Sequence, residues 1–309
     1  MNKSRIDAIV FWISLALCTM PFMLPPYALF LGLLLSFFIT NNPLGKKRSK
    51  VTSFLLKASI VGLGFGININ TALQAGKDGF IYTIVSITAT LLLGILLAKI
   101  FKVDKVTGYL VAAGTAICGG SAIAATAPVA NAKEEQISVS LVVVFVLNAI
   151  ALFIFPPIGH WLDLTQQQFG VWSAIAIHDT SSVVGAASTY GEEALNIATT
   201  IKLVRALWII PLTIVTAFIF KQKGSKVAIP WFIGLFVLAM LISSNVPQLE
   251  AVTPYIVRLA KIGFTVTLFL IGTGLSPKAL KAVGPKPLLQ GVVLWLIVSV
   301  AVLGFVMTF

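Results

Sequence analysis

Apolar stretches of about 20 residues recur from one end of the chain to the other, separated by short polar or proline-containing segments. An α-helix of that length crosses the hydrocarbon core of a bilayer, and it satisfies its own backbone hydrogen bonds there. The pattern therefore predicts an all-α polytopic membrane protein with eleven transmembrane helices. Their approximate ranges are 6–20, 25–40, 51–69, 79–101, 106–131, 135–159, 166–187, 193–220, 228–245, 252–275 and 287–309.

Composition strengthens this prediction. Hydrophobic residues make up 58% of the chain and charged residues 10%, whereas soluble domains carry about 25% charged residues. The formal net charge of +12 could suggest a nucleic-acid partner. However, no basic stripe alternates with exposed aromatic residues, and most Lys and Arg fall in short loops. We therefore expect the lipid bilayer as a partner and no nucleic acid.

The distribution of charge predicts an orientation. Basic residues cluster at 46–50, 99–105, 221–226 and 278–286, whereas the intervening loops carry most of the acidic residues. Loops rich in Lys and Arg remain on the cytoplasmic side. We therefore place the protein in a bacterial inner membrane, with the N-terminus cytoplasmic and the C-terminus periplasmic.

The chain also shows internal similarity. The segment PYALFLGLLLSFFITNNP (26–43) resembles PWFIGLFVLAMLISSNVP (230–247), and a glycine-rich helix end follows each. The two copies would be inverted in the membrane, as in inverted-repeat transporters, although apolar helices also resemble one another through composition alone. We predict one transporter domain over 1–309, with repeat-related segments at 25–101 and 228–309 and broken-helix pairs at 106–159 and 166–220.

The stretch ICGGSAIAA (117–125) places two glycines inside an apolar segment. A glycine pair weakens a helix, and a half-helix beginning here would offer free N–H groups to an anion. This predicts substrate-binding residues Cys118, Gly119, Gly120 and Ser121. Close packing between helices is the alternative explanation for small residues.

The stretch AIHDTSSVVGAAS (176–188) places His178 and Asp179 in the middle of a span. Ionisable groups at that depth usually mark a substrate or ion pathway, so we predict that Asp179 and His178 couple transport to an ion. Ser181 and Ser182 could donate to an anion, although Asp179 could also serve only as a helix cap. Arg205 is a candidate anion ligand or counter-ion, whereas Lys202, like other lysines near span ends, is expected to snorkel to the interface.

The motifs GTAICGGSAIAATAPVANAKEEQISVS, AIHDTSSVVGAAS and KLVRALWIIP resemble a family of bacterial conserved hypothetical membrane proteins labelled sulfate exporters, over nearly the whole chain. That family is grouped with the bile-acid/arsenite/riboflavin transporter superfamily, in which two discontinuous helices cross at mid-membrane between inverted repeats. The resemblance implies that Cys118, Gly119, Gly120 and Ser121 lie at one break. It places His178, Asp179, Thr180, Ser181 and Ser182 near the other. The order of repeats departs from that of the bile-acid sodium symporters, because the second break precedes its partner helices.

These features predict a secondary transporter that exports a small anion, such as sulfate or an organosulfonate, driven by a proton or sodium gradient. No P-loop is present. We expect no enzymatic activity, no cofactor beyond a coupling Na⁺ or H⁺, and no metal site, since the two cysteines lie in apolar segments without metal-ligand spacing. A membrane enzyme and an anion channel are the alternatives, and the sequence leaves assembly as a homo-oligomer open.

Overall fold

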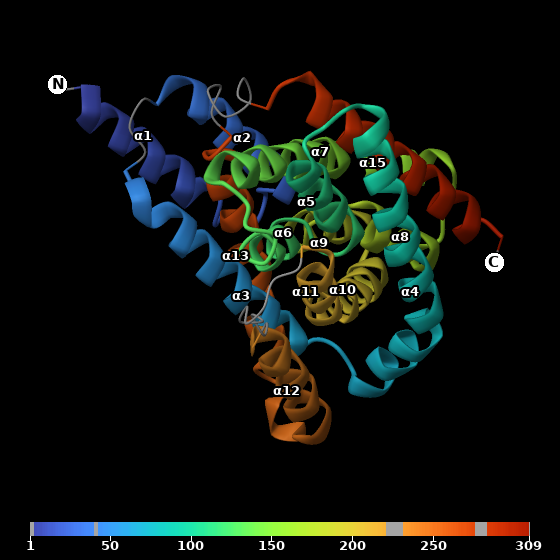
Figure 1. Cartoon of the computed structure of the whole chain (residues 1–309). Coiled ribbons are helices and arrows are strands. Elements are labelled where there is room, and N and C mark those ends of the chain that lie inside the picture. The colour runs from blue at the N-terminus through green and yellow to red at the C-terminus, as the bar shows by residue number, and fades with distance from the viewer. Residues whose placement is uncertain (1–2, 40–42, 221–230, 276–282, 309) are drawn as a thin grey trace. The chain divides into compact units, whose positions relative to one another are not determined.

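The computed structural model describes residues 3–39, 43–220, 231–275 and 283–308 (Figure 1). Every regular element within these ranges is a helix, which confirms the predicted all-α class. The helices are α1 (Lys3–Leu17), α2 (Pro25–Phe38), η1 (Gly45–Lys47), α3 (Arg48–Gly64), α4 (Ile69–Ile100), α5 (Lys105–Ala116), α6 (Gly120–Thr126), α7 (Glu134–Trp161), α8 (Gln166–Ala176), α9 (Thr180–Tyr190), α10 (Glu192–Leu207), α11 (Ile209–Ile219), α12 (Trp231–Asn245), η2 (Pro247–Leu249), α13 (Thr253–Gly272) and α15 (Pro285–Val306).

Five of the described segments are long and apolar enough to cross a membrane. They are Thr83–Ile100, Glu135–Trp161, Glu192–Ile219, Thr253–Gly272 and Pro285–Val306. Large apolar side chains such as Phe38, Trp161 and Phe218 remain more than 70% exposed, which suits a surface that contacts lipid rather than water. The protein is a polytopic helical membrane protein, and the total of eleven spans stays a prediction.

The chain forms two compact units. Unit 1 comprises Met1–Leu73 and Trp231–Pro277, and unit 2 comprises Gln74–Pro230 and Lys278–Phe309. The single transporter domain expected over 1–309 stays a prediction. The basic loops expected at 221–226 and around Lys278 and Lys281 lie outside the described residues.

In unit 1, α13 packs against α2 and α3, and α3 also packs against α12. The crossing of α2 and α13 is very close, because a Cβ atom added at Gly32 would collide with the carbonyl oxygen of Phe269, and one added at Gly272 would collide with that of Leu29. Small residues permit such backbone contact between membrane helices. The two segments with similar sequences, 26–43 and 230–247, contain helices α2 and α12, which belong to the same unit. Their inverted relation stays a prediction.

A buried glutamine links three helices of unit 2. Gln290 of α15 donates from Nε2 to the carbonyl oxygens of Gly94 in α4 (3.0 Å) and Gly108 in α5 (2.9 Å). On the other side of α5, an apolar cluster of Leu110, Ile123 and Val144 joins α5, α6 and α7. This packing fixes the helices that carry the candidate site.

Candidate functional site at two helix breaks

The first break lies where the sequence predicts it. Helix α5 ends at Ala116 and α6 begins at Gly120. Gly119 has φ +60° and ψ −121°, a backbone conformation that residues other than glycine rarely adopt. Its N–H donates back to the carbonyl oxygen of Gly114 (2.8 Å), so the backbone turns without leaving that amide unpaired.

The second break lies between Ala176, the last residue of α8, and Thr180, the first of α9. Asp179 is the N-cap of α9, and its Oδ1 accepts hydrogen bonds from the backbone N–H groups of Ser181 (2.6 Å) and Ser182 (3.1 Å). The Ser181 hydroxyl donates to the same oxygen, and the Ser182 hydroxyl donates to Oδ2 (2.7 Å). Asp179 therefore serves as a helix cap, which is the alternative that the sequence left open for it.

The two breaks meet. A Cβ atom added at Gly119 would lie 3.2 Å from the Cβ atom of Asp179 and 3.1 Å from a methyl group of Val144. Gly119 and Asp179, which lie 60 positions apart in the sequence, are thus in contact. The backbone of Gly119 packs against the side chain of Asp179. The predicted pair of discontinuous helices is confirmed within unit 2, and both interruptions face each other.

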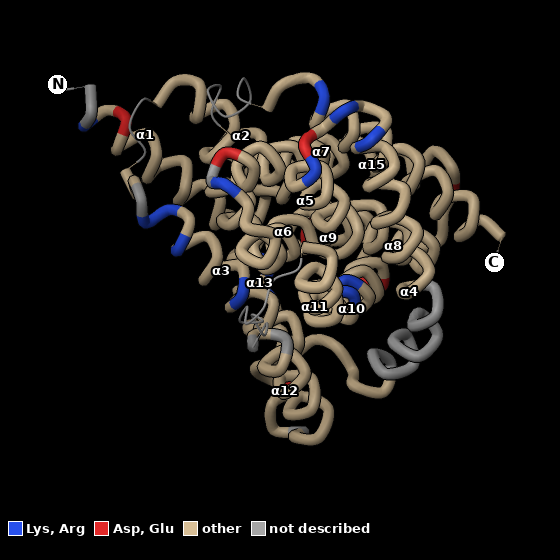
Figure 2. Tube along the Cα trace, in the orientation of Figure 1, with Lys and Arg blue, Asp and Glu red and all other residues tan. Residues whose placement is uncertain are grey.

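Buried charge is concentrated at this meeting point. His178, Asp179, Lys202 and Arg205 are the only Asp, Glu, Lys, Arg or His side chains buried in the described part of the chain. Figure 2 shows basic residues on α10 as well as on other helices such as α3. Lys202 and Arg205 both lie close enough to Cys118 and His178 to interact electrostatically with them. The site thus contains two cationic side chains and one carboxylate.

Lys202 binds the open end of α8. Its Nζ donates to the carbonyl oxygens of Ile177 (2.8 Å) and Ala174 (3.3 Å). Trp295 of α15 donates from Nε1 to the carbonyl oxygen of Ala176 (3.1 Å). The last carbonyl groups of a helix lack partners within the helix and carry its negative dipole end. Side chains from two other helices therefore satisfy them.

Arg205 binds the open end of α5 in the same manner. Its Nη2 donates to the carbonyl oxygen of Ala116 (2.5 Å), and Nη1 donates to the hydroxyl of Ser86 in α4 (2.6 Å). Lys202 also interacts electrostatically with the carboxyl group of Asp179. Both basic side chains thus lie at the C-terminal, negative ends of half-helices near the breaks.

The other predicted site residues differ in exposure. Cys118 is buried, Gly120 and Thr180 are partly buried, and Ser121 is exposed at the first turn of α6. Ser181 and Ser182 are buried with their hydroxyls on Asp179. The structure thus brings Gly119, Cys118, His178, Asp179 and Arg205 together.

Several buried polar atoms around the breaks have no hydrogen-bond partner in the protein. They include Nε of Arg205, Nδ2 of Asn148, both ring nitrogens of His178, and the hydroxyl oxygens of Thr115 and Thr199. Buried polar groups are normally satisfied. Most of these atoms can donate a hydrogen bond, so the region can accept an electron-rich ligand.

Comparison with known proteins places this sequence in a family. The model for "Conserved hypothetical protein 698" matches residues 6–291. The chain belongs to this family. A UPF0324 membrane protein of Bacteroides thetaiotaomicron is 55% identical over 288 residues, which cover 91% of this chain and 86% of the relative. A UPF0324 membrane protein of Vibrio parahaemolyticus is 51% identical and covers 99% of both chains. No solved structure matches the chain.

The sequence-based expectation for Lys202 needs correction. Lys202 is fully buried, so the expectation that it snorkels to the interface is wrong. Its place one helical turn before Arg205, on the same face of α10, is a signal that could have found it. Asn148 of α7 accepts from the backbone N–H of His178 (2.9 Å). This hydrogen bond ties α7 to the second break.

Proposed function

We propose that this protein is a secondary transporter of the bacterial inner membrane that exports a small anion, such as sulfate or an organosulfonate. The observation that carries the proposal is the presence of two buried basic side chains, Lys202 and Arg205, with a single buried acidic side chain, Asp179, among the described residues. An excess of positive charge in a low-dielectric region is unfavourable alone and favourable with a bound anion. The anion passes without chemical conversion and without a metal or other cofactor.

The anion site includes Arg205 and the first break. Arg205 uses two of its nitrogens to hold α4 and α5, while its Nε–H has no partner in the protein. Nε of Arg205, beside the first break, and Nδ2 of Asn148, beside the second break, are the donors that we propose for an oxyanion. Ser121 contributes the exposed approach to the site, and Gly120, Gly119 and Cys118 continue it inward, from partly buried to buried.

Coupling to H⁺ or Na⁺ takes place at Asp179 and His178. The carboxylate of Asp179 accepts hydrogen bonds at both oxygens, so protonation or cation binding would weaken the cap of α9. The ring nitrogens of His178 are free of hydrogen bonds within the protein. A change at either residue would therefore alter the second break, which contacts the first break at Gly119. In this way ion binding and anion binding would share one movable region.

Thermal unfolding of the purified full-length protein tests the proposal. Sulfate, an alkanesulfonate, phosphate and chloride are each added with and without Na⁺ at several pH values, since a ligand that binds the native state raises the apparent Tm. Sulfate or the sulfonate should raise Tm, and Arg205→Gln should reduce the apparent affinity by about tenfold to a hundredfold, the loss of one charge-assisted hydrogen bond and its charge.

Arg258→Gln is the matched control, because Arg258 is an exposed arginine of α13 in unit 1. It should leave the anion-dependent shift unchanged. If no anion shifts Tm, or if both arginine variants lose the shift equally, the anion site is refuted. Uptake of the stabilising anion into inverted vesicles then separates transport from simple binding, and single-channel conductance would favour a channel instead.

A further inference from the structure

Unit 2 contains a second candidate site, away from the helix breaks. A cavity of about 300 Å³ lies where α4 ends, α5 begins and α11 ends. Its walls include Ile95 and Ala98 of α4, Val103 of the connecting turn, and Ile219 at the end of α11. The volume lies at the lower end of the range for ligand pockets, about 300–1,000 Å³.

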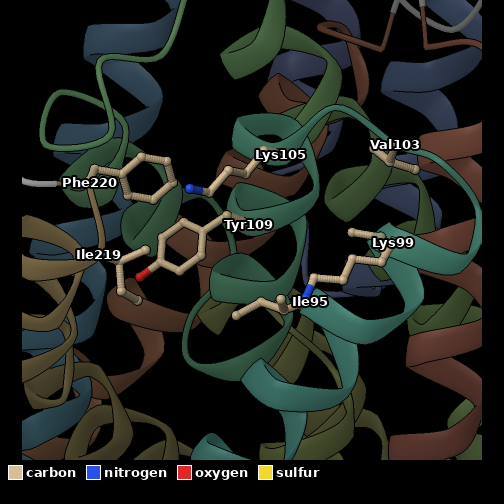
Figure 3. Close-up of a pocket in the computed structure, with 8 residues that line it drawn as sticks. Ile95, Lys99, Val103, Lys105, Tyr109, Ile219 and Phe220 are labelled. Carbon is tan, nitrogen blue, oxygen red and sulfur yellow. The ribbon is translucent and has the colours of Figure 1, made fainter.

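Two lysines border this cavity. Lys99 lies in the last turn of α4 and Lys105 is the first residue of α5, and both are exposed. The Nζ atom of Lys105 lies 5.2 Å from the centroid of the Phe220 ring, within the range of a cation–π interaction. In Figure 3, Lys105 extends toward Phe220, whereas Lys99 reaches back along α4 toward Ile95. The lysines thus border an apolar chamber from two helices.

The aromatic wall is fixed in place. The hydroxyl groups of Tyr109 and Thr216 are 2.6 Å apart and share a hydrogen bond that links α5 to α11. The ring of Tyr109 packs edge-on against that of Phe220, with centroids 5.2 Å apart. Because its hydroxyl is engaged by Thr216, Tyr109 presents mainly its ring to the cavity. The chamber therefore offers apolar contact inside and positive charge outside.

We propose that this cavity binds an anionic phospholipid of the surrounding bilayer, with the phosphate held by Lys99 and Lys105 and an acyl chain against Ile95, Val103 and Ile219. The ligand must be both anionic and apolar, which a phospholipid satisfies and a free inorganic anion does not. The position also fits, because the apolar span of α4 ends at Ile100 and so places the two lysines at the level of lipid headgroups. Basic pockets between membrane helices on the cytoplasmic side bind such headgroups.

The simplest alternative is that both lysines only extend to the interface as topological signals. That alternative predicts no preference for one lipid headgroup and no special role for these two lysines among their neighbours. Lys102 provides the comparison. It lies in the same turn, three residues from each of the two lysines, and is exposed, but it is not among the residues that line the cavity.

The test measures lipid binding by the purified full-length protein in detergent. Phosphatidylglycerol and phosphatidylcholine with identical acyl chains are titrated separately, and the apparent Kd is taken from the rise in Tm with lipid concentration. Phosphatidylglycerol should stabilise the wild type, and phosphatidylcholine should not. Lys99→Gln and Lys105→Gln should each weaken the binding of phosphatidylglycerol about fivefold, and the double variant about thirtyfold.

The Lys102→Gln variant should bind phosphatidylglycerol within about twofold of the wild type, because it removes the same charge from the same turn without altering the cavity. Equal stabilisation by phosphatidylcholine, or an equal loss in Lys102→Gln, would overturn the proposal. Inorganic phosphate and glycerol phosphate distinguish the source of the phosphate. If either reproduces the lipid effect and loses it in the double variant, the site binds a soluble phosphate rather than a lipid. If the folded variant that carries both Lys99→Gln and Lys105→Gln still binds phosphatidylglycerol tightly, the proposal is also refuted.

Discussion

At the scale of single residues, the site depends on how buried charges and backbone groups satisfy one another. Asp179 is bound by donors from Ser181 and Ser182, and Lys202 is bound by carbonyl oxygens of the helix that precedes them. The C-terminal ends of α5 and α8 each have a basic side chain beside them, and the N-terminal end of α9 has Asp179. Such partners allow interrupted helices to exist inside a membrane. Mutations at these residues should separate structural from coupling roles.

Replacing Asp179 with Asn should retain the fold and remove coupling. Asn is as good an N-cap as Asp, so Tm should fall by only a few degrees, whereas the group that binds a proton or cation is lost. The measurement is anion flux in proteoliposomes with an imposed pH or Na⁺ gradient. Flux should cease to depend on the gradient. Asp179→Ala, which also removes the cap, should be less stable than Asp179→Asn by about 1 kcal/mol. Full gradient dependence in Asp179→Asn would exclude the coupling role.

Replacing Lys202 with Met should destabilise the protein. Met fills a similar volume but leaves the carbonyl oxygens of Ala174 and Ile177 without their donor, at about 1–3 kcal/mol for buried acceptors. Loss of the desolvation penalty of the ammonium group offsets part of this. Thermal unfolding checks the sign against Lys133→Met, which alters an exposed lysine. A higher Tm in Lys202→Met would mean that the buried charge costs more than its hydrogen bonds contribute.

At the scale of elements, capping and close packing position the broken helices. Asp104 caps α5 through the N–H of Thr107 (3.0 Å) and accepts from Nε2 of Gln136 in α7 (2.6 Å). One side chain therefore links the start of α5 to the first turn of α7. Gln290 then ties α5 to α4 and α15. These contacts fix the position of α5 and hence of the first break.

The contribution of Asp104 should depend on pH. The backbone N–H of Thr107 holds the pKa of Asp104 below its ordinary value of 3.8. A lowered pKa in the folded state stabilises the fold above pH 3.8, and that stabilisation is lost as pH falls through the folded-state pKa. Asp104→Ala should therefore lose about 0.5–1 kcal/mol near neutral pH, the low end for a cap because the group is exposed.

Unfolding by denaturant at pH 7 and pH 3 tests this prediction, and the difference between wild type and Asp104→Ala should shrink at the lower pH. Glu250→Ala removes an exposed carboxylate from unit 1 and should show no comparable effect. If the difference for Asp104→Ala is the same at both pH values, the cap acts through packing rather than through its charge.

Gln290→Leu should loosen unit 2. Leucine preserves volume but cannot donate to the carbonyl oxygens of Gly94 and Gly108, and the expected loss of stability is about 1–3 kcal/mol. Thermal unfolding checks it, with Leu296→Ala on the exposed face of α15 as a surface control. An unchanged Tm in Gln290→Leu would show that glycine packing alone holds α4 against α5.

At the scale of the whole molecule, the candidate sites all lie in one of the two compact units. Unit 2 contains both helix breaks and all four buried Asp, Lys, Arg and His side chains of the described residues, as well as the apolar cavity with Lys99 and Lys105. Unit 1 is apolar inside, with a core that includes Phe11, Leu35 and Phe269. The proposed chemistry of transport thus belongs to unit 2.

The predicted orientation can be tested on the intact chain. Eleven spans require the two termini to lie on opposite sides of the membrane, with the basic loops in the cytoplasm. Reporter fusions that are active only in the periplasm should be silent at the N-terminus and active at the C-terminus. Activity at both termini, or at neither, would show an even number of spans and would contradict the count.

The sequence by itself determined the all-α membrane class of the protein and the positions of both breaks. In lipid, an apolar stretch must satisfy its backbone locally and so becomes a helix. Gly119-Gly120 and Asp179 with its two serines act through local backbone chemistry that sequence displays directly. Only the tertiary structure decided that Gly119 contacts Asp179, that Lys202 of α10 is buried against the end of α8, and that Gln290 joins three helices. These contacts join residues far apart in the chain, so their partners depend on how helices pack rather than on any local pattern.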